Sequence, residues 1–191
     1  MIVLAGPNGA GKSTLYETRV APSFAGPFVN ADIIQRDELR DPSPAASYEA
    51  AAIAAARRAE HIAQGRDFVT ETVFSHPSKL ELLNRARGNG FTVIVMHVGV
   101  ETPDLCAARV GARVEEGGHP VPDDKIRARY LRGASLIRAA VAKADRGMVF
   151  DNSALNRSPV HGLTFAHGQL VFAAARLPAW IRSVYAAELA V

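Results

Sequence analysis

The sequence begins with MIVLAGPNGAGKST (residues 1–14), the stretch that decides which fold the remaining residues are expected to complete. Met1 to Ala5 form a short apolar run, which is typical of a buried strand in a parallel sheet. Residues 6–13 match the pattern G-x-x-x-x-G-K-[ST] at every fixed position, and a helix-compatible segment starts at Lys12. A strand, a glycine-rich loop and a helix in this order predict a loop that binds phosphate groups.

The residue types of this loop explain how it would hold phosphate. Glycines let the backbone curl until successive N–H groups point inward, and the following helix adds its free amides and the positive end of its dipole. Lys12 is expected to reach the β- and γ-phosphates as a catalytic cation, and the Ser13 hydroxyl is expected to bind Mg²⁺. The predicted contacts of a nucleoside triphosphate with Mg²⁺ are Gly6, Pro7, Asn8, Gly9, Ala10, Gly11, Lys12, Ser13 and Thr14.

The rest of the chain alternates short apolar runs with longer helical patterns. Strands are expected at residues 27–30, 67–70, 91–98 and 147–150, and helices are expected to begin near residues 12, 44, 76, 103 and 123. Two further apolar runs flank His167-Gly168 and predict a hairpin, followed by a helix from Pro178. The predicted fold class is α/β, a P-loop NTPase-type parallel sheet with helices on both faces, a helical lid (about residues 104–143) and a C-terminal β-hairpin plus helix, in one domain over residues 1–191.

Composition and charge narrow the range of partners. Hydrophobic residues make up 48% and charged residues 21% of the 191 positions, which is a globular balance. A net charge of +3 is too small to favour a nucleic-acid partner. We find no apolar run of about 18 residues and no signal-peptide pattern, and the only cysteine, Cys106, is expected to be a buried apolar residue. The sequence therefore predicts a cytoplasmic protein that binds neither nucleic acid nor membrane.

Three acidic residues directly follow predicted strands. Because ligands of open parallel sheets bind beyond the carboxyl ends of the strands, Asp32, Glu71 and Asp151 are expected near the phosphate loop. Asp32 is the candidate base for an acceptor hydroxyl, with capping of a short helix as the structural alternative. Glu71 is expected to hold a substrate hydroxyl or a Mg²⁺-bound water. Asp151 is expected to shape a turn near the adenine.

A loop rich in Gly and Pro (residues 117–122) joins two predicted helices that carry several arginines. Phosphoryl transfer needs cations around the moving group, and a mobile segment that brings them in also excludes water. Arg113 and Arg127 are the predicted catalytic cations of this lid. A solvated helix face is the alternative for both, and this alternative has more weight for Arg109, Arg129 and Arg132. His119 in the loop is expected to be structural.

Residues 6–14, Asn30-Ala31-Asp32, Thr70-Glu71-Thr72 and the segment from Arg113 to Arg127 together resemble the zeta-toxin family, in particular its short P-loop ATPase branch. The resemblance extends from Met1 to about Ser153. Zeta toxins are kinases that use ATP and Mg²⁺ to phosphorylate the 3′-hydroxyl of the sugar in UDP-N-acetylglucosamine.

The resemblance implies an ATP-dependent kinase with Mg²⁺ and a small-molecule acceptor, such as this nucleotide sugar. It assigns Asp32 as the base, Glu71 and Thr72 to the acceptor, and Arg113 and Arg127 to the triphosphate and the transferred group. A protein antitoxin is a further partner that the sequence alone neither requires nor excludes. Two other readings stay open, namely another nucleoside or sugar kinase, and a nucleotide-dependent switch that controls a partner.

Overall fold

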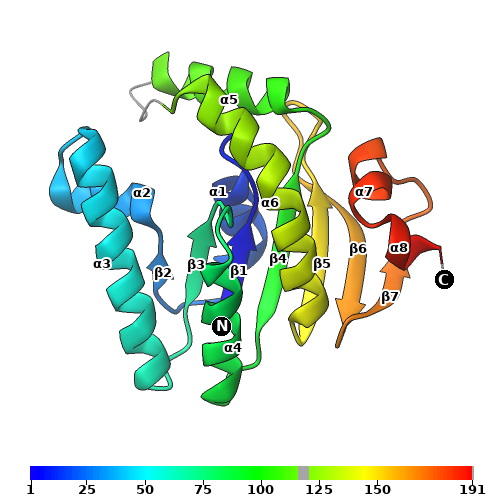
Figure 1. The fold of residues 1–191 in the computed structure, drawn as a ribbon, viewed down its shortest axis with the longest axis horizontal. Coiled ribbons are helices and arrows are strands. Elements are labelled where there is room, and N and C mark those ends of the chain that lie inside the picture. Colours follow the sequence, from blue (N-terminus) through cyan, green and yellow to red (C-terminus); the bar gives the residue numbers. More distant parts are fainter. Residues whose placement is uncertain (116–120, 191) are drawn as a thin grey trace.

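One seven-stranded sheet organises the chain, of which a computed structural model describes residues 1–115 and 121–190. The strand order is β2-β3-β1-β4-β5-β6-β7 (Figure 1). Strands β1 to β5 pair in parallel, and β6 and β7 extend the sheet in antiparallel pairing. The strands are β1 Ile2–Ala5, β2 Phe28–Val29, β3 Val69–Thr72, β4 Ile94–Gly99, β5 Arg146–Asp151, β6 Val160–Ala166 and β7 Gln169–Ala173. The predicted fold class is confirmed, and each predicted strand is present with its ends shifted by up to three residues, so that Glu71 lies within β3 and not after it.

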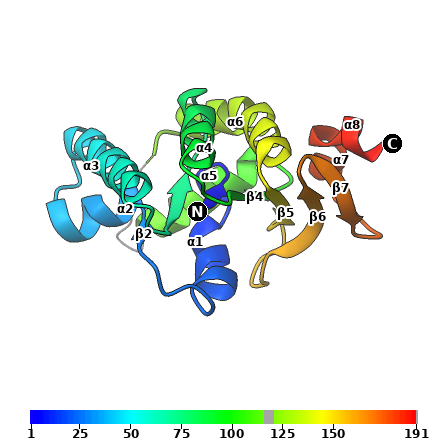
Figure 2. The same cartoon turned by 90° about the horizontal axis from the view of Figure 1, so that it is seen from below.

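Helices cover both faces of the sheet. Helices α3, α4 and α6 lie on one face, whereas α1 lies on the other (Figure 2). The α-helices are α1 Lys12–Leu15, α2 Ala31–Ile33, α3 Pro44–Ala63, α4 Ser78–Gly88, α5 Pro103–Glu115, α6 Asp123–Lys143, α7 Ala179–Val184 and α8 Ala186–Leu189. Among the described residues, no helix combines the length and the hydropathy that a membrane crossing requires.

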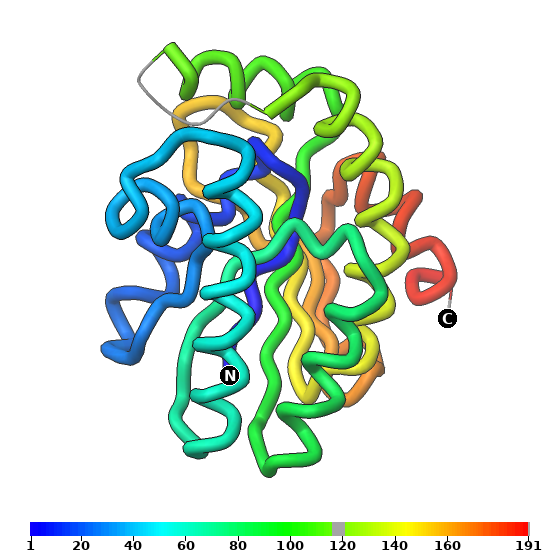
Figure 3. The backbone as a smooth tube through the Cα atoms, turned by 60° about the vertical axis from the view of Figure 1, so that its left-hand side comes forward, coloured from blue at the N-terminus to red at the C-terminus, as the bar shows by residue number. Residues whose placement is uncertain are grey.

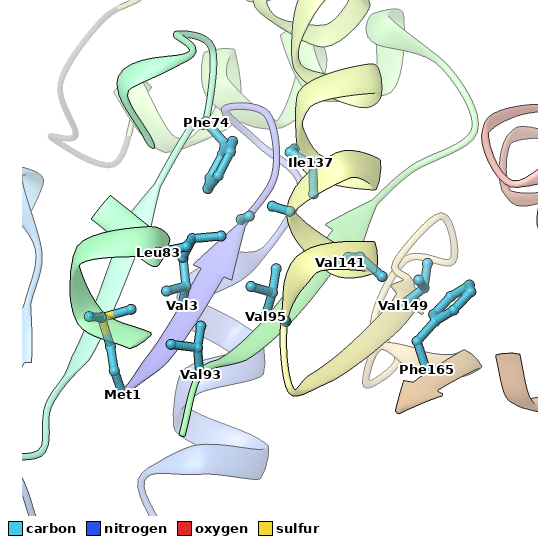
Figure 4. Close-up of a cluster of buried hydrophobic side chains, with 14 of the residues drawn as sticks. Met1, Val3, Phe74, Leu83, Val93, Val95, Ile137, Val141, Val149 and Phe165 are labelled. Atoms are coloured by element: carbon cyan, nitrogen blue, oxygen red, sulfur yellow. The ribbon is translucent and has the colours of Figure 1, made fainter. Parts of the chain in front are cut away.

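Each face of the sheet has its own apolar layer. Figure 4 shows the larger layer, in which Leu83 of α4 and Ile137 of α6 lie over Val3 and Val95 of the central strands. The smaller layer buries Leu4, Leu15 and Phe150, among others, under α1. Alternate residues of β1 thus enter opposite layers, because successive side chains of a strand point to opposite faces. The short apolar run at the N-terminus is therefore a central strand, buried on both sides.

Helix α3 shows how a local pattern places residues beside the site. The side chain of Ser43 caps it by accepting a hydrogen bond from the Ala46 amide (3.2 Å), and Pro44 occupies the first turn. One face of the helix is buried at every fourth position, in the series Ala46, Ala50, Ala54, Arg58 and Ile62. Four of these residues are apolar and small or medium-sized. The arginine in the series is an exception that contact with the sheet does not explain.

Three local features differ from the sequence-based expectation or add to it. Helices α1 and α2 continue as π-helical segments, η1 Tyr16–Val20 and η2 Ile34–Leu39, which the hydrophobic pattern does not reveal. The single helix predicted from Pro178 is divided at Tyr185, whose φ of −108° and ψ of 24° interrupt it. The predicted hairpin turns at His167 and Gly168 with φ values of 49° and 81°, as a primed two-residue turn requires.

Helix α5 lies above the carboxyl edge of the parallel strands, and α6 begins beside it and runs down along the sheet face (Figure 1). In Figure 3, α5 crosses over the chain that follows β5. Nη2 of Arg109 on α5 donates to the Ala154 carbonyl oxygen (3.2 Å), which joins these two segments. The tip of the predicted lid, residues 116–120 with His119, lies outside the described residues.

Candidate active site

The phosphate loop follows β1, and at two of its glycines both the backbone conformation and the available space exclude a side chain. Gly9 and Gly11 have left-handed backbones, with φ values of 76° and 88°. A Cβ on Gly9 would overlap the Cys106 carbonyl, and a Cβ on Gly11 would overlap the amide group of Asn152. The Asn152 amide also donates to the carbonyl oxygen of Ala10 (2.9 Å). The loop is thus fixed from above by α5 and by the end of β5.

Cys106 takes part in this packing through its backbone. Its side chain is fully buried, as the sequence predicts. Burial raises the pKa of the thiol to about 11, so the thiolate is not available near neutral pH.

Glu71 lies at the centre of the polar contacts beneath the loop. It stands on β3, whose neighbour in the sheet is β1, and its side chain is 10% exposed. One carboxylate oxygen accepts hydrogen bonds from Ser13 Oγ and Asn30 Nδ2, each at 3.0 Å. The other oxygen lies 3.5 Å from Nζ of Lys12, which also donates to the carbonyl oxygen of Pro7. The carboxylate therefore positions the lysine and the hydroxyl of the phosphate loop together.

This group of contacts fits a magnesium ion and a triphosphate. Mg²⁺ takes oxygen ligands and usually keeps several waters and phosphate oxygens, so it needs few protein ligands. The Ser13 hydroxyl beside the Glu71 carboxylate offers such ligands. Among the described residues no group of three or more His, Cys, Asp or Glu has metal-binding geometry, so the fit depends on Ser13, Glu71 and the nucleotide's own oxygens.

Asp32 lies at the start of α2, opposite the phosphate loop. Its backbone amide donates to Oδ1 of Asn30 (2.8 Å), so that Asn30 caps the helix and Asp32 does not. The capping alternative for Asp32 is thus filled by another residue. Asn30 in turn binds Glu71 through its amide nitrogen. One asparagine therefore links the position of Asp32 to the phosphate loop.

Two adjoining cavities meet at these residues. The larger has a volume of about 620 Å³ and extends from Gly9 and Thr14 toward Arg113 and residues 154–158. The smaller has a volume of about 210 Å³ and extends toward Ala54 and Thr72. Both cavities are lined by Asn8, Lys12, Asp32 and Glu71. A nucleotide in the first cavity and an acceptor in the second would meet at Asp32.

The arginines predicted for the lid separate into different positions. Arg113 lines the larger cavity, and so does Arg109. Arg127 is not among the described residues that line the cavity, and its guanidinium pairs with Asp104 and Asp123, each at 2.6 Å. These two hydrogen-bonded carboxylates raise the pKa of Arg127.

Arg109 and Arg129 make contacts that the sequence pattern does not distinguish. Nη1 of Arg109 is buried and has no hydrogen-bond partner among the described residues. Arg129 of α6 donates to Oδ1 of Asn8 in the phosphate loop (3.0 Å). The spacing of charges along a helix could not separate these residues from a solvated face, because their roles depend on how α5 and α6 cross the sheet edge.

Asp151 and the segment after it complete the larger cavity. Oδ1 of Asp151 accepts hydrogen bonds from Ser153 Oγ (2.6 Å) and from the indole of Trp180 (2.7 Å). These contacts agree with the predicted turn-forming role. Residues 154–158 beyond this turn line the cavity, although the sequence contains no motif there.

The sequence patterns also did not indicate two cations that line the smaller cavity. Arg58 of α3 and Lys79 of α4 line it together with Ala51 and Ala54. The one feature of the sequence that could have indicated Arg58 is its place in an otherwise apolar stripe of α3.

Comparisons with known proteins show the family and the fold of the chain. The family model described as AAA domain (AAA_33) matches residues 1–134, which include the phosphate loop, Asp32, Glu71 and Arg113. A protein of uncharacterised function from Haemophilus influenzae is 32% identical over 134 residues, covering 68% of this chain and 91% of that protein. The fold is that of P-loop kinase-like proteins. The chain belongs to the AAA domain family.

Solved structures resemble the fold at low sequence identity. A chain of the PezAT chromosomal toxin-antitoxin system of Streptococcus pneumoniae has a TM-score of 0.62 and 13% identity, covering 100% of this chain and 84% of that one. A chain of the AvrRxo1-ORF1:AvrRxo1-ORF2 complex has a TM-score of 0.67 and 14% identity, and a structure of that complex with ATP has a TM-score of 0.64 and 15% identity. Both cover 88% of this chain, which spans only 59% of the chain it matches in that complex.

Proposed function

We propose that this protein is an ATP- and Mg²⁺-dependent kinase that transfers the γ-phosphate to a hydroxyl group of a small molecule. The observation that carries the proposal is the position of Asp32, which lines both the phosphate-loop cavity and the adjoining smaller cavity. A carboxylate between donor and acceptor sites is placed to receive the proton of the attacking hydroxyl. A nucleotide-dependent switch has no need of a base at the entrance to a second cavity.

The proposed reaction is an in-line transfer. The acceptor oxygen bonds to the γ-phosphorus as its proton passes to the Asp32 carboxylate, and the bond from phosphorus to the bridging oxygen of ADP breaks. Lys12 and Arg113 stabilise the negative charge on the phosphoryl oxygens. Bound Mg²⁺ supplies further charge neutralisation at the β- and γ-phosphates.

The roles of Glu71 and Thr72 follow from their contacts. Since Glu71 accepts a hydrogen bond from the Ser13 hydroxyl, it orients this metal-binding group and a metal-bound water more directly than it holds the acceptor. Thr72 lines only the smaller cavity, which we call the acceptor cavity from here on, and its hydroxyl accepts a hydrogen bond from the Phe74 amide (3.1 Å). We assign Thr72 to the acceptor side.

A nucleotide sugar such as UDP-N-acetylglucosamine is the first acceptor to test, because the residues in and around the phosphate loop resemble those of zeta toxins. A protein antitoxin belongs to the same proposal, and the PezAT toxin-antitoxin system supports it only through a shared fold. Co-expression with the product of a neighbouring gene, followed by gel filtration, tests this partner.

The decisive experiment follows label from γ-labelled ATP, with Mg²⁺, into UDP-N-acetylglucosamine, nucleosides and free sugars. Asp32→Asn should lower transfer by about 10²–10⁴-fold, as loss of a general base does, with ATP binding unchanged. Asp37→Asn is the matched control, because Asp37 is exposed and pairs with Arg36 outside the described cavity lining. Equal turnover of Asp32→Asn and wild type would exclude Asp32 as the base. ATP hydrolysis without any labelled acceptor would favour the switch.

A further inference from the structure

The acceptor cavity contains a buried arginine that has no protein partner in the described structure. Arg58 is 7% exposed, yet it forms no ion pair or side-chain hydrogen bond with any of residues 1–115 and 121–190. Its neighbour Arg57 is exposed and pairs with Glu38. Glu38 is therefore the partner of Arg57 and not of Arg58. A buried charge without a partner is costly, and proteins usually pair or neutralise it.

A second cation stands beside Arg58. Lys79 of α4 lines the same cavity, and burial together with the Arg58 charge lowers its pKa. Burial lowers the pKa of Arg58 as well. The two residues also line a third cavity of about 460 Å³ with Glu81, which lies beyond ion-pair distance of both. Two like charges held together at the wall of a cavity indicate that an anion completes the site.

The carboxylates of the acceptor cavity do not supply this anion. Glu71 already interacts with Lys12, Ser13 and Asn30. Asp32 belongs to the other end of the cavity, where it faces the phosphate loop. Ala51 and Ala54 line the wall of α3 before Arg58 and leave space that larger side chains would fill.

We propose that the acceptor carries an oxyanion, a phosphate or a carboxylate group, which binds Arg58 and Lys79 while its hydroxyl group faces Asp32. A planar guanidinium and an ammonium together match the charge and the several acceptor oxygens of such a group. This inference rests on the proposed kinase function and narrows its substrates to anionic small molecules. It assigns specificity to helices α3 and α4, which lie outside the phosphate loop and the lid.

The test uses inorganic phosphate as the probe, with acetate in parallel. The protein is first saturated with Mg²⁺ and a non-hydrolysable ATP analogue, so that phosphate cannot occupy the phosphate loop, and each anion is then titrated by calorimetry. Phosphate should bind the wild type in a saturable manner and about ten-fold more weakly to Arg58→Met and to Lys79→Gln. Arg85→Gln is the control, because Arg85 is exposed and lines only the third cavity. Tighter binding of acetate would assign the site to carboxylates.

The outcome is independent of whether Arg58→Met folds, since Lys79 is only partly buried and its variant reports separately. Absence of saturable binding of both anions to the wild type would overturn the inference. Equal binding by both variants and the wild type would do the same. Binding of the ATP analogue is measured in the preceding step. If the analogue binds and the anions do not, only the anion site fails; if the analogue itself does not bind, the proposed kinase function fails.

Discussion

The two ends of the active site differ in how their polar groups are held. At the phosphate loop the charged and hydroxyl groups contact one another, with Glu71 joining Lys12, Ser13 and Asn30. At the smaller cavity, which is the proposed acceptor end, Arg58 and Lys79 lack such partners among the described residues. Preorganised groups suit the part of the reaction that every P-loop kinase shares. Unpaired groups suit the part that a particular substrate must complete.

The largest effect should come from the lid. Arg113→Ala removes a cation from the cavity and should lower kcat by about 10³-fold, with a much smaller change in KM for ATP. Arg127→Ala removes a charge that already pairs with Asp104 and Asp123, so it should change kcat by about two-fold or less. Steady-state kinetics of both variants measures the difference. Equal losses would show that α5 and α6 rearrange when substrates bind.

Breaking the preorganised end should reduce both stability and activity. Glu71→Ala leaves Lys12 buried without its carboxylate and should lower the free energy of unfolding by about 3 kcal/mol, as loss of one partner of a buried ion pair does. Transfer should fall by about 10²-fold because Ser13 and Lys12 lose their positions. Urea unfolding with a parallel transfer assay gives both numbers. An unchanged unfolding midpoint would argue against Glu71 as the organising residue.

A third effect is the pH dependence of stability that arises from a buried histidine in the same sheet. His97 on β4 is buried, its Nδ1 lies 2.8 Å from the Tyr185 hydroxyl, and burial lowers its pKa to about 3. The unfolded state therefore binds one more proton than the folded state between about pH 6.5 and pH 3. This contribution to stability is complete above about pH 6.5, and about 2 kcal/mol of it should be lost by pH 5. Urea titrations at pH 7 and pH 5 measure the free energy of unfolding, which should change less between the two pH values in His97→Gln than in the wild type. Equal changes in both proteins would exclude His97 as the cause.

The smallest effect should be an increase in stability, whereas the preceding changes lower stability or activity. Arg58→Met replaces a buried, unpaired charge with a shorter, unbranched apolar side chain and should raise the free energy of unfolding by about 1 kcal/mol. Thermal unfolding without added anion is the measurement, and Arg57→Met, which loses the exposed pair with Glu38, is the matched control. If Arg58→Met is clearly less stable than the wild type, Arg58 has a structural role and the contrast between the two ends of the site disappears.

Local patterns predicted most of the fold because each rests on a short-range rule. The hairpin at His167-Gly168 and the Ser43-Pro44 start of α3 are both confirmed. The π-helical continuations and the division of the last helix at Tyr185 were not predictable. The division at Tyr185 coincides with a contact to the sheet, the hydrogen bond between Tyr185 and His97, which a local pattern does not contain.

The sequence by itself determined the phosphate loop and the acidic residues at the strand ends. This was possible because parallel strands bring their carboxyl ends to one edge of the sheet, so that Asp32 and Glu71 had to lie near Lys12. Only the tertiary structure decided which arginines face the cavities. That Arg113 does so while Arg127 is held by two aspartates, and that Arg58 is buried beside Lys79, depends on how the helices rotate and cross the sheet. Helical spacing gives the relative direction of side chains on one helix, whereas packing sets the direction of the helix itself.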